Sequence, residues 1–596
     1  MESCKLLIKF MRGKLLKYIA SIICVGLNIA FTMLVPIVIS ITIDSIIGNK
    51  PIDAPMIIMK GIEYIGGKSV MAKNIWICSL AIVLITIFRG ISIYLGGKWS
   101  AEASESTAKN MRDELYKHLQ LLSYDYHIKS ETGDLIQRCT SDIETVKKFL
   151  TTQLVEIGYA VFMLTGVLTV MLSLNIKLTL VAMAVVPIIF IFSIIFFNVV
   201  KRTFKVADEA EGKLSNVLQE NLTAMRVVRA FGRQSYEIDK FDKSNKLFKD
   251  LTYKLMRQLA WYWSLSDFIC LLQIAFVLII GSYLSAKGEI TLGTLVVFIT
   301  YEGLLLWPVR QMGRILSDMG KTIVATSRIK EILDENTEYE KIEQLKPEIL
   351  GNIEFKNVTF QYDEGKEALK DISFTVGKGQ TIAILGPTGS GKTSLVNLLG
   401  RLYDYQKGSI KIDGVELKNI DKKWVRSHIG IVLQEPFLYG KTIKANIGIA
   451  KENVEDEEIF NVAKDTSIHD VIMGFKNGYD TLVGERGVTL SGGQKQRSAI
   501  ARILINNYPI LAFDDSLSAV DTETDAHIRK ALKERNGDTT TFIISHRIGT
   551  IAEADLILVL EQGKLTQIGK HEELLNEHGL YKRIWDMQNS LEEKLG

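Results

Sequence analysis

The sequence predicts a multi-domain membrane protein, in which an all-α domain of six spans with long cytoplasmic helical extensions precedes an α/β domain. Three observations support this fold class. The chain has 596 residues, of which 47% are hydrophobic and 23% are charged, so it is too long for one small domain. Uncharged stretches long enough to cross a bilayer occur only before about residue 310. From residue 352 onward, short alternating runs typical of strands replace them.

The composition argues against several other classes of protein. Lys and Arg total 71 and Asp and Glu total 68, a net charge of +3, so we expect no nucleic-acid partner. The 9 prolines are too few for a linker-rich chain. The 5 cysteines are never two or three residues apart, which argues against a disulfide framework and a CxxC metal site.

The first uncharged stretch runs from Tyr18 to Ile43. At about 26 residues it exceeds both the ~20 that a helix needs to cross a bilayer and the ~15 of a signal peptide's apolar region. We therefore predict a span that the mature chain retains. The six predicted spans are about 18–43, 74–97, 157–176, 178–200, 258–284 and 290–310.

Positive charge orients these spans. Lys and Arg are abundant before the first span and in the connections Lys98–Glu156 and Lys201–Arg257, and they are sparse in the opposite connections. This bias predicts that both termini are cytoplasmic. The two inner connections lack proline and carry apolar residues at helical spacing. We therefore expect helices that extend the spans by about 25 residues per arm, at ~1.5 Å per residue.

Some polar and aromatic side chains fall within or beside the spans. Charges are costly in lipid, so we expect the charged ones to face the bundle interior or water. The aromatic ones either line a cavity for amphiphilic molecules or anchor and pack the helices. The charged residues are Arg89, Glu156, Asp267, Glu302 and Arg310, and the aromatic ones are Trp261, Trp263, Tyr301 and Trp307.

Changes of pattern along the chain predict its domain boundaries. A basic amphipathic segment precedes the first span, and a mostly polar stretch follows the last one. Alternating runs then begin, and Asp413-Gly414 supplies a hairpin signal. The predicted parts are an N-terminal cytoplasmic segment 1–17, a transmembrane domain 18–330, a linker 331–350 and an α/β domain 351–596.

A glycine-rich loop is the strongest signal in the chain. The apolar run Thr381–Leu385 reads as a buried strand, and GPTGSGKTS follows it in the pattern GxxxxGK[ST]. Such loops hold phosphates with backbone N–H groups at a helix start. Lys392 would neutralise phosphate charge and the Thr393 hydroxyl would bind Mg²⁺. The predicted nucleotide-binding residues of this loop are Gly386, Pro387, Thr388, Gly389, Ser390, Gly391, Lys392, Thr393 and Ser394.

Two further motifs complete a phosphate site. The apolar run Pro509–Phe513 ends in Asp514, which would hold Mg²⁺ as the Walker B carboxylate. Between the glycine-rich loop and Asp514, LSGGQKQR at Leu490–Arg497 opens a predicted helix that continues through Leu504. Its glycines and serine expose backbone donors at a helix start, which predicts a second anion site.

With these motifs in place, the sequence resembles the ABC transporter superfamily over essentially its whole length. LSGGQ is similar to the family signature, and the order of domains resembles an exporter-type half-transporter. The resemblance implies that Tyr362 stacks on adenine, that Gln434 senses Mg²⁺ and the attacking water, and that His546 meets the γ-phosphate. It also implies a D-loop residue, Asp521, and signature residues that act on the partner's ATP: Ser491, Gly492, Gly493 and Gln494.

The resemblance further implies ATP and Mg²⁺ as cofactors and a second half-transporter as partner, with two ATP molecules sandwiched between them. Coupling helices are expected near Ser123–Arg138 and Gln219–Phe231. They would transmit closure of the ATPase domains to the spans, which produces alternating access.

One position departs from the family pattern. Asp515 stands where the family carries a glutamate that serves as general base. The carboxylate is one methylene shorter and lies back by about 1.5 Å, and a misplacement of ~1 Å can cost about 10²-fold in rate. We therefore expect this site to bind ATP but to hydrolyse it poorly, as in the noncatalytic half of heterodimeric multidrug-type exporters.

The predicted function is ATP-driven export of amphiphilic small molecules, drug-like or lipid-like, by a multi-pass protein of the cell (plasma or inner) membrane. The chain would be surrounded by membrane lipids and would pair with a different half-transporter. Two alternatives remain open at this stage. One is a homodimeric exporter with slow activity at two identical sites, and the other is an ATP-gated channel or regulatory subunit.

Overall fold

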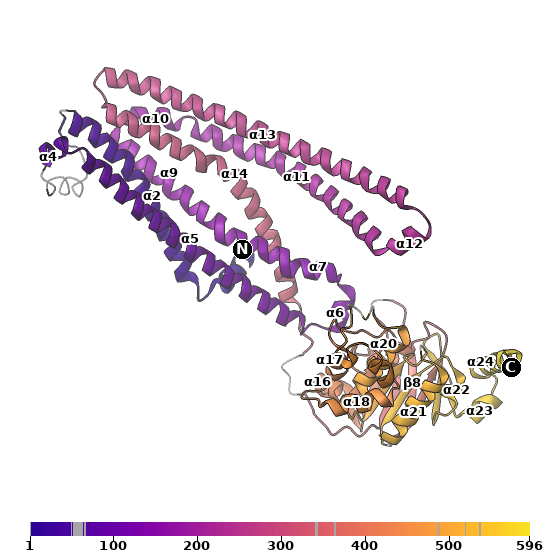
Figure 1. Cartoon of the computed structure of the whole chain (residues 1–596). Coiled ribbons are helices and arrows are strands. Elements are labelled where there is room, and N and C mark those ends of the chain that lie inside the picture. The colour runs from indigo at the N-terminus through magenta and orange to yellow at the C-terminus, as the bar shows by residue number, and fades with distance from the viewer. Residues whose placement is uncertain are drawn as a thin grey trace. The chain divides into compact units, whose positions relative to one another are not determined.

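A computed structural model describes residues 2–48, 50–51, 64, 67–339, 344–362, 365–484, 487, 489–518, 520–535 and 538–595. The chain divides into two compact units (Figure 1). One unit consists of Met1–Leu122 and Ser130–Asn336, and the other of Ser123–Lys129 and Thr337–Gly596.

The first unit is all-α in its described residues. Its helices are α1 (Glu2–Met11), α2 (Leu15–Ile41), α4 (Gly67–Lys73), α5 (Trp76–Leu119), α7 (Thr132–Gln137), α8 (Ile143–Lys148), α9 (Leu154–Leu174), α10 (Ile176–Met183), α11 (Val186–Thr223), α12 (Met225–Ala230), α13 (Gln234–Ala286) and α14 (Leu292–Asp334). Short π-helical segments at Thr42–Ile47, Arg138–Asp142 and Phe149–Gln153 continue or join them.

Six helical stretches of this unit are long and apolar enough to cross a membrane, counting only the described residues. Each overlaps one predicted span, which confirms the six-span fold class. The stretches are Leu15–Ile47, Trp76–Leu119, Thr132–Leu174, Ile176–Thr223, Gln234–Ala286 and Leu292–Asp334.

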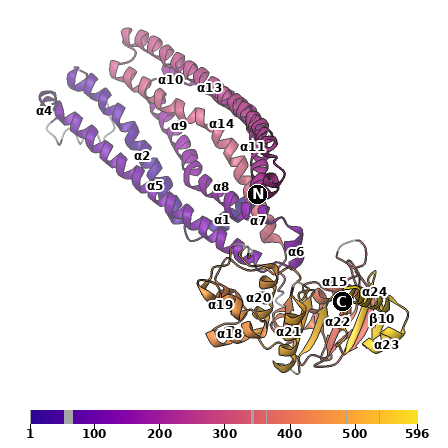
Figure 2. The ribbon, with the colours of Figure 1, turned by 45° about the vertical axis from the view of Figure 1, so that its right-hand side comes forward.

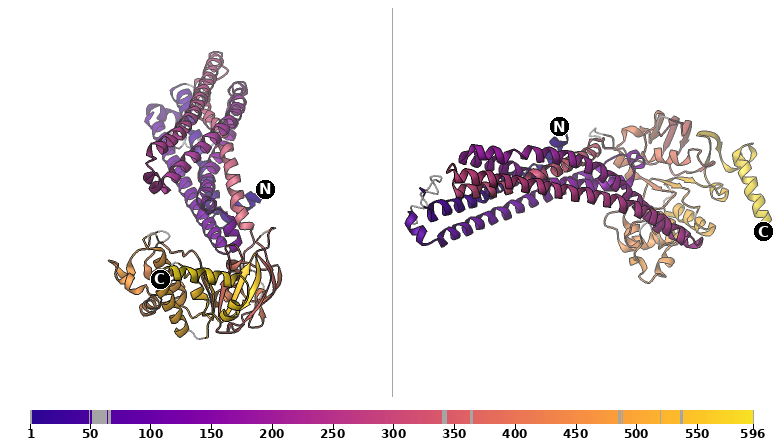
Figure 3. Two further views of the ribbon diagram at one scale, coloured as in Figure 1. Left: turned by 90° about the vertical axis from the view of Figure 1, so that its right-hand side faces the viewer. Right: turned by 90° about the horizontal axis from the view of Figure 1, so that it is seen from above.

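The helices continue well beyond the apolar stretches, as predicted. α13 has 53 residues and is therefore about 80 Å long at ~1.5 Å per residue. α11 and α13 lie alongside each other and are joined through the short α12 (Figure 1, Figure 3).

The fourth predicted span is broken in the structure. α10 ends at Met183 and α11 begins at Val186, with a bend between them. Pro187 stands in the first turn of α11. Its ring removes one N–H donor and clashes with the preceding turn of a continuous helix, so the helix restarts there.

Four of the five charged residues predicted in or beside the spans have polar partners. Glu302 is the exception: it is fully buried, and neither of its carboxylate oxygens has a hydrogen-bond partner within the described residues. Arg310 is buried and forms an ion pair with Asp267. Glu156 accepts a hydrogen bond of 2.9 Å from Arg314. Arg89 donates to the Asn28 side chain at 3.3 Å.

The four predicted aromatic residues of the bundle differ in their surroundings. Tyr301 is fully buried, and its hydroxyl donates to the Met33 carbonyl at 2.6 Å. The rings of Trp263 and Trp307 stack with centroids 6.0 Å apart. Trp261, by contrast, is 71% exposed. The packing interpretation therefore fits Tyr301, whereas Trp307 is 56% exposed and also lines a cavity of about 100 Å³.

The second unit is an α/β domain to which the short helix α6 (Tyr124–Lys129) also belongs. Its strands are β1 (Ile353–Phe360), β2 (Leu369–Val376), β3 (Thr381–Leu385), β4 (Lys407–Ile412), β5 (Val415–Glu416), β6 (Ile429–Val432), β7 (Ile510–Asp514), β8 (Thr540–Ile544), β9 (Leu556–Glu561) and β10 (Lys564–Gly569). Its other helices are α15 (Lys392–Leu399), α16 (Lys422–His428), α17 (Ile443–Gly448), α18 (Asp456–Asp465), α19 (His469–Met473), α20 (Gly492–Leu504), α21 (Thr522–Arg535), α22 (Ile548–Ile551), α23 (His571–Asn576) and α24 (Leu580–Leu595).

Two sheets form the framework of this unit (Figure 2). An antiparallel sheet has the order β2-β1-β4-β5, and a larger sheet has the order β10-β9-β3-β8-β7-β6. In the larger sheet β9, β3, β8, β7 and β6 are parallel, and the central strands are fully buried. Apolar residues of both sheets and of α15 form one continuous core.

Candidate nucleotide-binding site

Three neighbouring strands of the larger sheet bring the predicted motifs together. β3, β8 and β7 are adjacent and parallel, so their carboxyl ends lie at the same edge. β3 leads into the glycine-rich loop, β7 ends at Asp514, and Ser545-His546 follows β8. Ligands of open parallel sheets bind at this edge.

Two glycines allow the loop to pass close to neighbouring backbone. A Cβ on Gly386 would lie 2.2 Å from the Leu560 carbonyl oxygen, and one on Gly391 would lie 2.7 Å from the Ala368 carbonyl oxygen. Gly391 also has φ 104°, a conformation that side chains disfavour. These positions therefore require glycine, and α15 starts at the next residue, with its N-terminus at the loop.

The Lys392 side chain folds back onto the glycine-rich loop. Its ammonium donates to the carbonyls of Gly386 at 2.8 Å and Pro387 at 3.0 Å. Burial lowers the pKa of Lys392, and the carboxylates of Asp515 and Asp514 oppose that shift. The Lys392 ammonium thus interacts with both the loop carbonyls and the two carboxylates. A phosphate group bound at the loop would also be attracted to this positive charge.

Thr393 and Asp514 form a pair suited to a small divalent cation. The Thr393 hydroxyl donates to Asp514 Oδ1 at 3.2 Å, and Asp514 is only 3% exposed. Burial raises the pKa of Asp514; the nearby Asp515 adds to this, and the Thr393 hydrogen bond opposes it. A hydroxyl and a carboxylate are the hard oxygen ligands that Mg²⁺ prefers, so these residues fit the implied metal.

A cavity of about 270 Å³ lies in front of these groups. It brings together most of the predicted ATP-binding and catalytic side chains; Gly386 and Pro387 do not line it, although both accept a hydrogen bond from Lys392. Ala368 and Ile544 also line it and were missed, because an apolar residue carries no motif signal. The lining residues are Tyr362, Ala368, Thr388, Gly389, Ser390, Gly391, Lys392, Thr393, Ser394, Gln434, Asp514, Asp515, Ile544 and His546.

Tyr362 is one of the residues that line the cavity. Its ring is 42% exposed, and its hydroxyl lies 2.8 Å from the Ser394 hydroxyl. Tyr403 meets this ring edge-on with centroids 5.0 Å apart, and Tyr124 of α6 meets Tyr403 at 5.6 Å. The ring is therefore partly exposed at the cavity and lies next to a group of further aromatic residues.

Asp515 lines the cavity directly after the buried end of β7. Its backbone N–H donates to the Ile544 carbonyl at 3.1 Å, and its φ is 44°, which Asp tolerates better than most residues. Its carbonyl accepts the Ser518 hydroxyl at 2.7 Å. Oδ1 is buried and has no hydrogen-bond partner within the described part of the chain, so one carboxylate oxygen is available for a ligand.

The signature residues lie elsewhere in the domain. The Ser491 hydroxyl caps α20 by accepting the Gln494 N–H at 3.3 Å, while Gln494 Oε1 accepts the Ser491 N–H at 2.9 Å. Gly492 and Gly493 form the first turn of this helix. Asp521 caps α21 through two hydrogen bonds from Thr524. None of these five predicted residues lines the described cavity.

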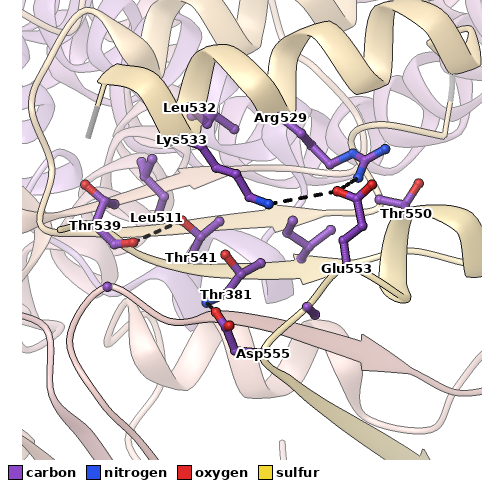
Figure 4. Close-up of a pocket in the computed structure, with 13 residues that line it drawn as sticks. Thr381, Leu511, Arg529, Leu532, Lys533, Thr539, Thr541, Thr550, Glu553 and Asp555 are labelled. Atoms are coloured by element: carbon purple, nitrogen blue, oxygen red, sulfur yellow. Dashed lines mark hydrogen bonds and ion pairs between the residues drawn. The ribbon is translucent and has the colours of Figure 1, made fainter. Parts of the chain in front are cut away.

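A second cavity, of about 310 Å³, lies at the amino ends of the same strands (Figure 4). Arg529 and Lys533 of α21 both approach Glu553 there, at 2.8 and 4.0 Å. Asp555 accepts the Thr381 N–H at 2.8 Å. These charged groups have protein partners already, so the cavity does not resemble a phosphate site.

The glycine-rich loop, the Thr393–Asp514 pair and the sheet that presents them define a P-loop nucleotide-binding domain, which this chain joins to a six-span helical bundle. Comparison with known families agrees with this class. The family model described as ABC transporter transmembrane region matches residues 18–309, and the one described as ABC transporter matches residues 369–518. The chain belongs to the ABC transporter family and is a multi-pass membrane protein.

Individual relatives cover nearly the whole chain. It is 34% identical over 577 residues to the uncharacterised ABC transporter ATP-binding protein YknU of Bacillus subtilis, covering 95% of this chain and 94% of that protein. It is 33% identical over 585 residues to a candidate multidrug export ATP-binding/permease protein of Staphylococcus aureus, covering 98% and 99%. A solved structure of a bacterial Atm1-family ABC exporter with ATP bound matches with TM-score 0.80 and 28% identity, covering 96% and 98%.

Proposed function

We propose that this chain is half of an ATP-driven exporter of amphiphilic small molecules, drug-like or lipid-like, in the cell membrane. Both termini and the nucleotide-binding domain are cytoplasmic in this proposal, as the positive-inside bias predicts. Its partner is a second, different half-transporter. ATP-driven closure of the paired domains shifts the bundle between inward- and outward-facing states.

Two findings support export of such molecules. The chain fuses the bundle and the nucleotide-binding domain, as in an exporter-type half-transporter. Relatives that match it over most of their length carry names that describe multidrug export, and the matching solved structure is that of an ABC exporter.

The residue after the Walker B carboxylate carries the asymmetric part of the proposal. Lys392, Thr393, Asp514 and His546 line one cavity, which supports the proposal that Mg²⁺-ATP binds here. Asp515 also lines that cavity, but its carboxylate is one methylene shorter than that of a glutamate. General bases contribute about 10²–10⁴-fold to rate. Binding is therefore retained while hydrolysis is weak.

In this site each group has a separate task. The backbone of the P-loop and Lys392 bind phosphate oxygens, and the Thr393 hydroxyl and Asp514 hold Mg²⁺, which would supply charge neutralisation. Tyr362 stacks on the base. Because Asp515 cannot approach the attacking water closely, ATP stays bound here and stabilises the closed dimer.

The experiment compares Asp515→Glu with the unmodified full chain, purified in lipid nanodiscs alone and with its partner. We expect the chain alone to hydrolyse Mg²⁺-ATP barely above a Lys392→Ala control, and Asp515→Glu to raise the rate by up to about 10²-fold. The Kd for ATP should change less than about threefold. Native mass spectrometry of each sample establishes whether one or two kinds of chain are present.

Robust turnover by the unmodified chain without a partner would instead support the homodimer with two working sites. An unchanged rate in Asp515→Glu, with ATP binding intact, would show that carboxylate length does not limit hydrolysis.

A further inference from the structure

The C-terminal helix α24 packs beside the segment that carries His546. Tyr581 of α24 is fully buried in a cluster with Ile548 and Ile551 of α22. Ile584 and Trp585 pack against the same cluster, so α24 is anchored at this place in the domain (Figure 2).

One side chain of α24 holds the backbone on both sides of Arg547. Gln588 Nε2 donates to the His546 carbonyl at 2.7 Å, and Gln588 Oε1 accepts the Ile548 N–H at 3.0 Å. Arg547, the residue before α22, makes no side-chain cap to that helix. Gln588 therefore satisfies a helix N–H that has no other protein partner among the described residues.

The same short segment is also fixed from the opposite direction. The Arg547 guanidinium donates to the carbonyls of Ser518 and Val520, at 2.9 and 2.8 Å. The Ser518 hydroxyl in turn donates to the Asp515 carbonyl. The segment from His546 to Ile548 is thus bonded to Gln588 and, through the Arg547 side chain and Ser518, is linked to the backbone of Asp515.

We infer that Gln588 is a positioning residue for His546, so that α24 sets how well this histidine meets the nucleotide. The His546 side chain itself is exposed at the cavity, so its direction depends on the backbone that Gln588 holds. The inference rests on the proposed function, in which His546 contacts the γ-phosphate.

The test is a double-mutant cycle of Gln588→Met and His546→Ala in the full chain, run in both the Asp515 and the Asp515→Glu backgrounds. Gln588→Met keeps the length of the side chain and removes both hydrogen bonds. In the Asp515→Glu background, in which this chain's own site turns over, we expect kcat to fall about fivefold, a size typical of one or two lost hydrogen bonds, while KM for ATP changes less than twofold. In His546→Ala the same substitution should have no further effect, because coupled residues are not additive.

A second measurement does not depend on turnover. Hydrogen–deuterium exchange of the peptide that contains Ile548 should accelerate in Gln588→Met. Gln588→Glu, which keeps an acceptor for the Ile548 N–H, should restore protection of that amide without restoring kcat, because a carboxylate repels the His546 carbonyl.

Gln567→Met is the matched control. Gln567 accepts the Tyr581 N–H at the start of α24 at 3.2 Å and does not contact the His546 segment. It should lower the melting temperature without changing kcat or Ile548 exchange. An equal loss of kcat from Gln588→Met with and without His546, or unchanged Ile548 exchange, would overturn the inference. Failure of Asp515→Glu to gain turnover would contradict only the proposed asymmetry.

Discussion

Tyr362 shows how single residues of the site combine two interactions. Its hydroxyl bonds to Ser394 in the first turn of α15, and its ring rests edge-on against Phe360 and Tyr403. We expect a base to contact the ring and not the hydroxyl. Bases stack on the faces of aromatic rings, whereas the hydroxyl is already paired with Ser394.

The two contributions can be separated by mutation. Tyr362→Ala should weaken ATP binding by about tenfold or more, because stacking on one base is worth ~1–3 kcal/mol. Tyr362→Phe removes only the bond to Ser394 and should bind within about threefold of the unmodified chain. Isothermal titration with Mg²⁺-ATP measures both. Equal losses in the two variants would show that the hydroxyl, and not the ring, supports binding.

At the scale of elements, the β4–β5 hairpin is a short-range feature that the sequence predicts correctly. Asp413 and Gly414 have φ 48° and 80°, the conformation that Asp-Gly favours in two-residue hairpins. Asp413 also accepts hydrogen bonds from the backbone of Leu350, Gly351 and Asn352. These hydrogen bonds therefore hold the residues that directly precede β1 against the hairpin.

The protonation of Asp413 gives this contact a pH dependence. Burial alone would raise the pKa of Asp413, but hydrogen bonds from Asn352, Gly351 and Leu350 outweigh burial and hold the pKa below its usual value. A lowered pKa stabilises the fold above the unfolded-state pKa, and this contribution disappears as pH falls through the folded-state pKa.

Asp413→Asn keeps the turn conformation, because Asn also tolerates positive φ, but it loses the charge. We expect its free energy of unfolding to be lower by about 1.5–3 kcal/mol at pH 7. The difference from the unmodified chain should shrink below about pH 4. Thermal unfolding of the full chain across pH measures this, and a difference that stays constant with pH would exclude the charge as its cause.

The broken fourth span illustrates what hydropathy misses within an element. Apolar composition predicts one span over 178–200, whereas Pro187 separates α10 from α11. Hydropathy measures transfer into lipid and contains no information on backbone hydrogen bonds.

At the scale of the whole molecule, the proposed asymmetry assigns different duties to the two nucleotide motifs of this chain. Lys392 belongs to the weak site, whereas Ser491 would complete the ATP site of the partner. In the purified two-chain assembly, Lys392→Ala should therefore leave at least half of the ATPase rate. Ser491→Ala should lower the rate about tenfold or more, since lost transition-state donors commonly cost at least that.

The control for this comparison is Ser491→Thr, which keeps a hydroxyl able to cap α20. It should retain most of the rate, so a loss in Ser491→Ala is not due to fraying of the helix alone. If Lys392→Ala and Ser491→Ala were equally damaging, the two sites would be equivalent and the assembly symmetric.

The sequence by itself determined the six apolar helices, the P-loop at Gly386–Ser394 and the carboxylates that end β7. Each of these is local: a span needs one long apolar stretch, and a P-loop needs one strand, its glycines and the following helix start. The substitution at Asp515 is likewise visible without coordinates.

Only the tertiary structure decided which of these pieces meet. The order β3-β8-β7 places the loop, Asp514 and His546 around one cavity. The tertiary structure also places α6 with the nucleotide-binding unit. It also brings Gln588 to the His546 carbonyl, 42 residues away in sequence. Strand order and helix docking depend on burial of apolar surface between distant segments, and no local pattern records which segments bury one another.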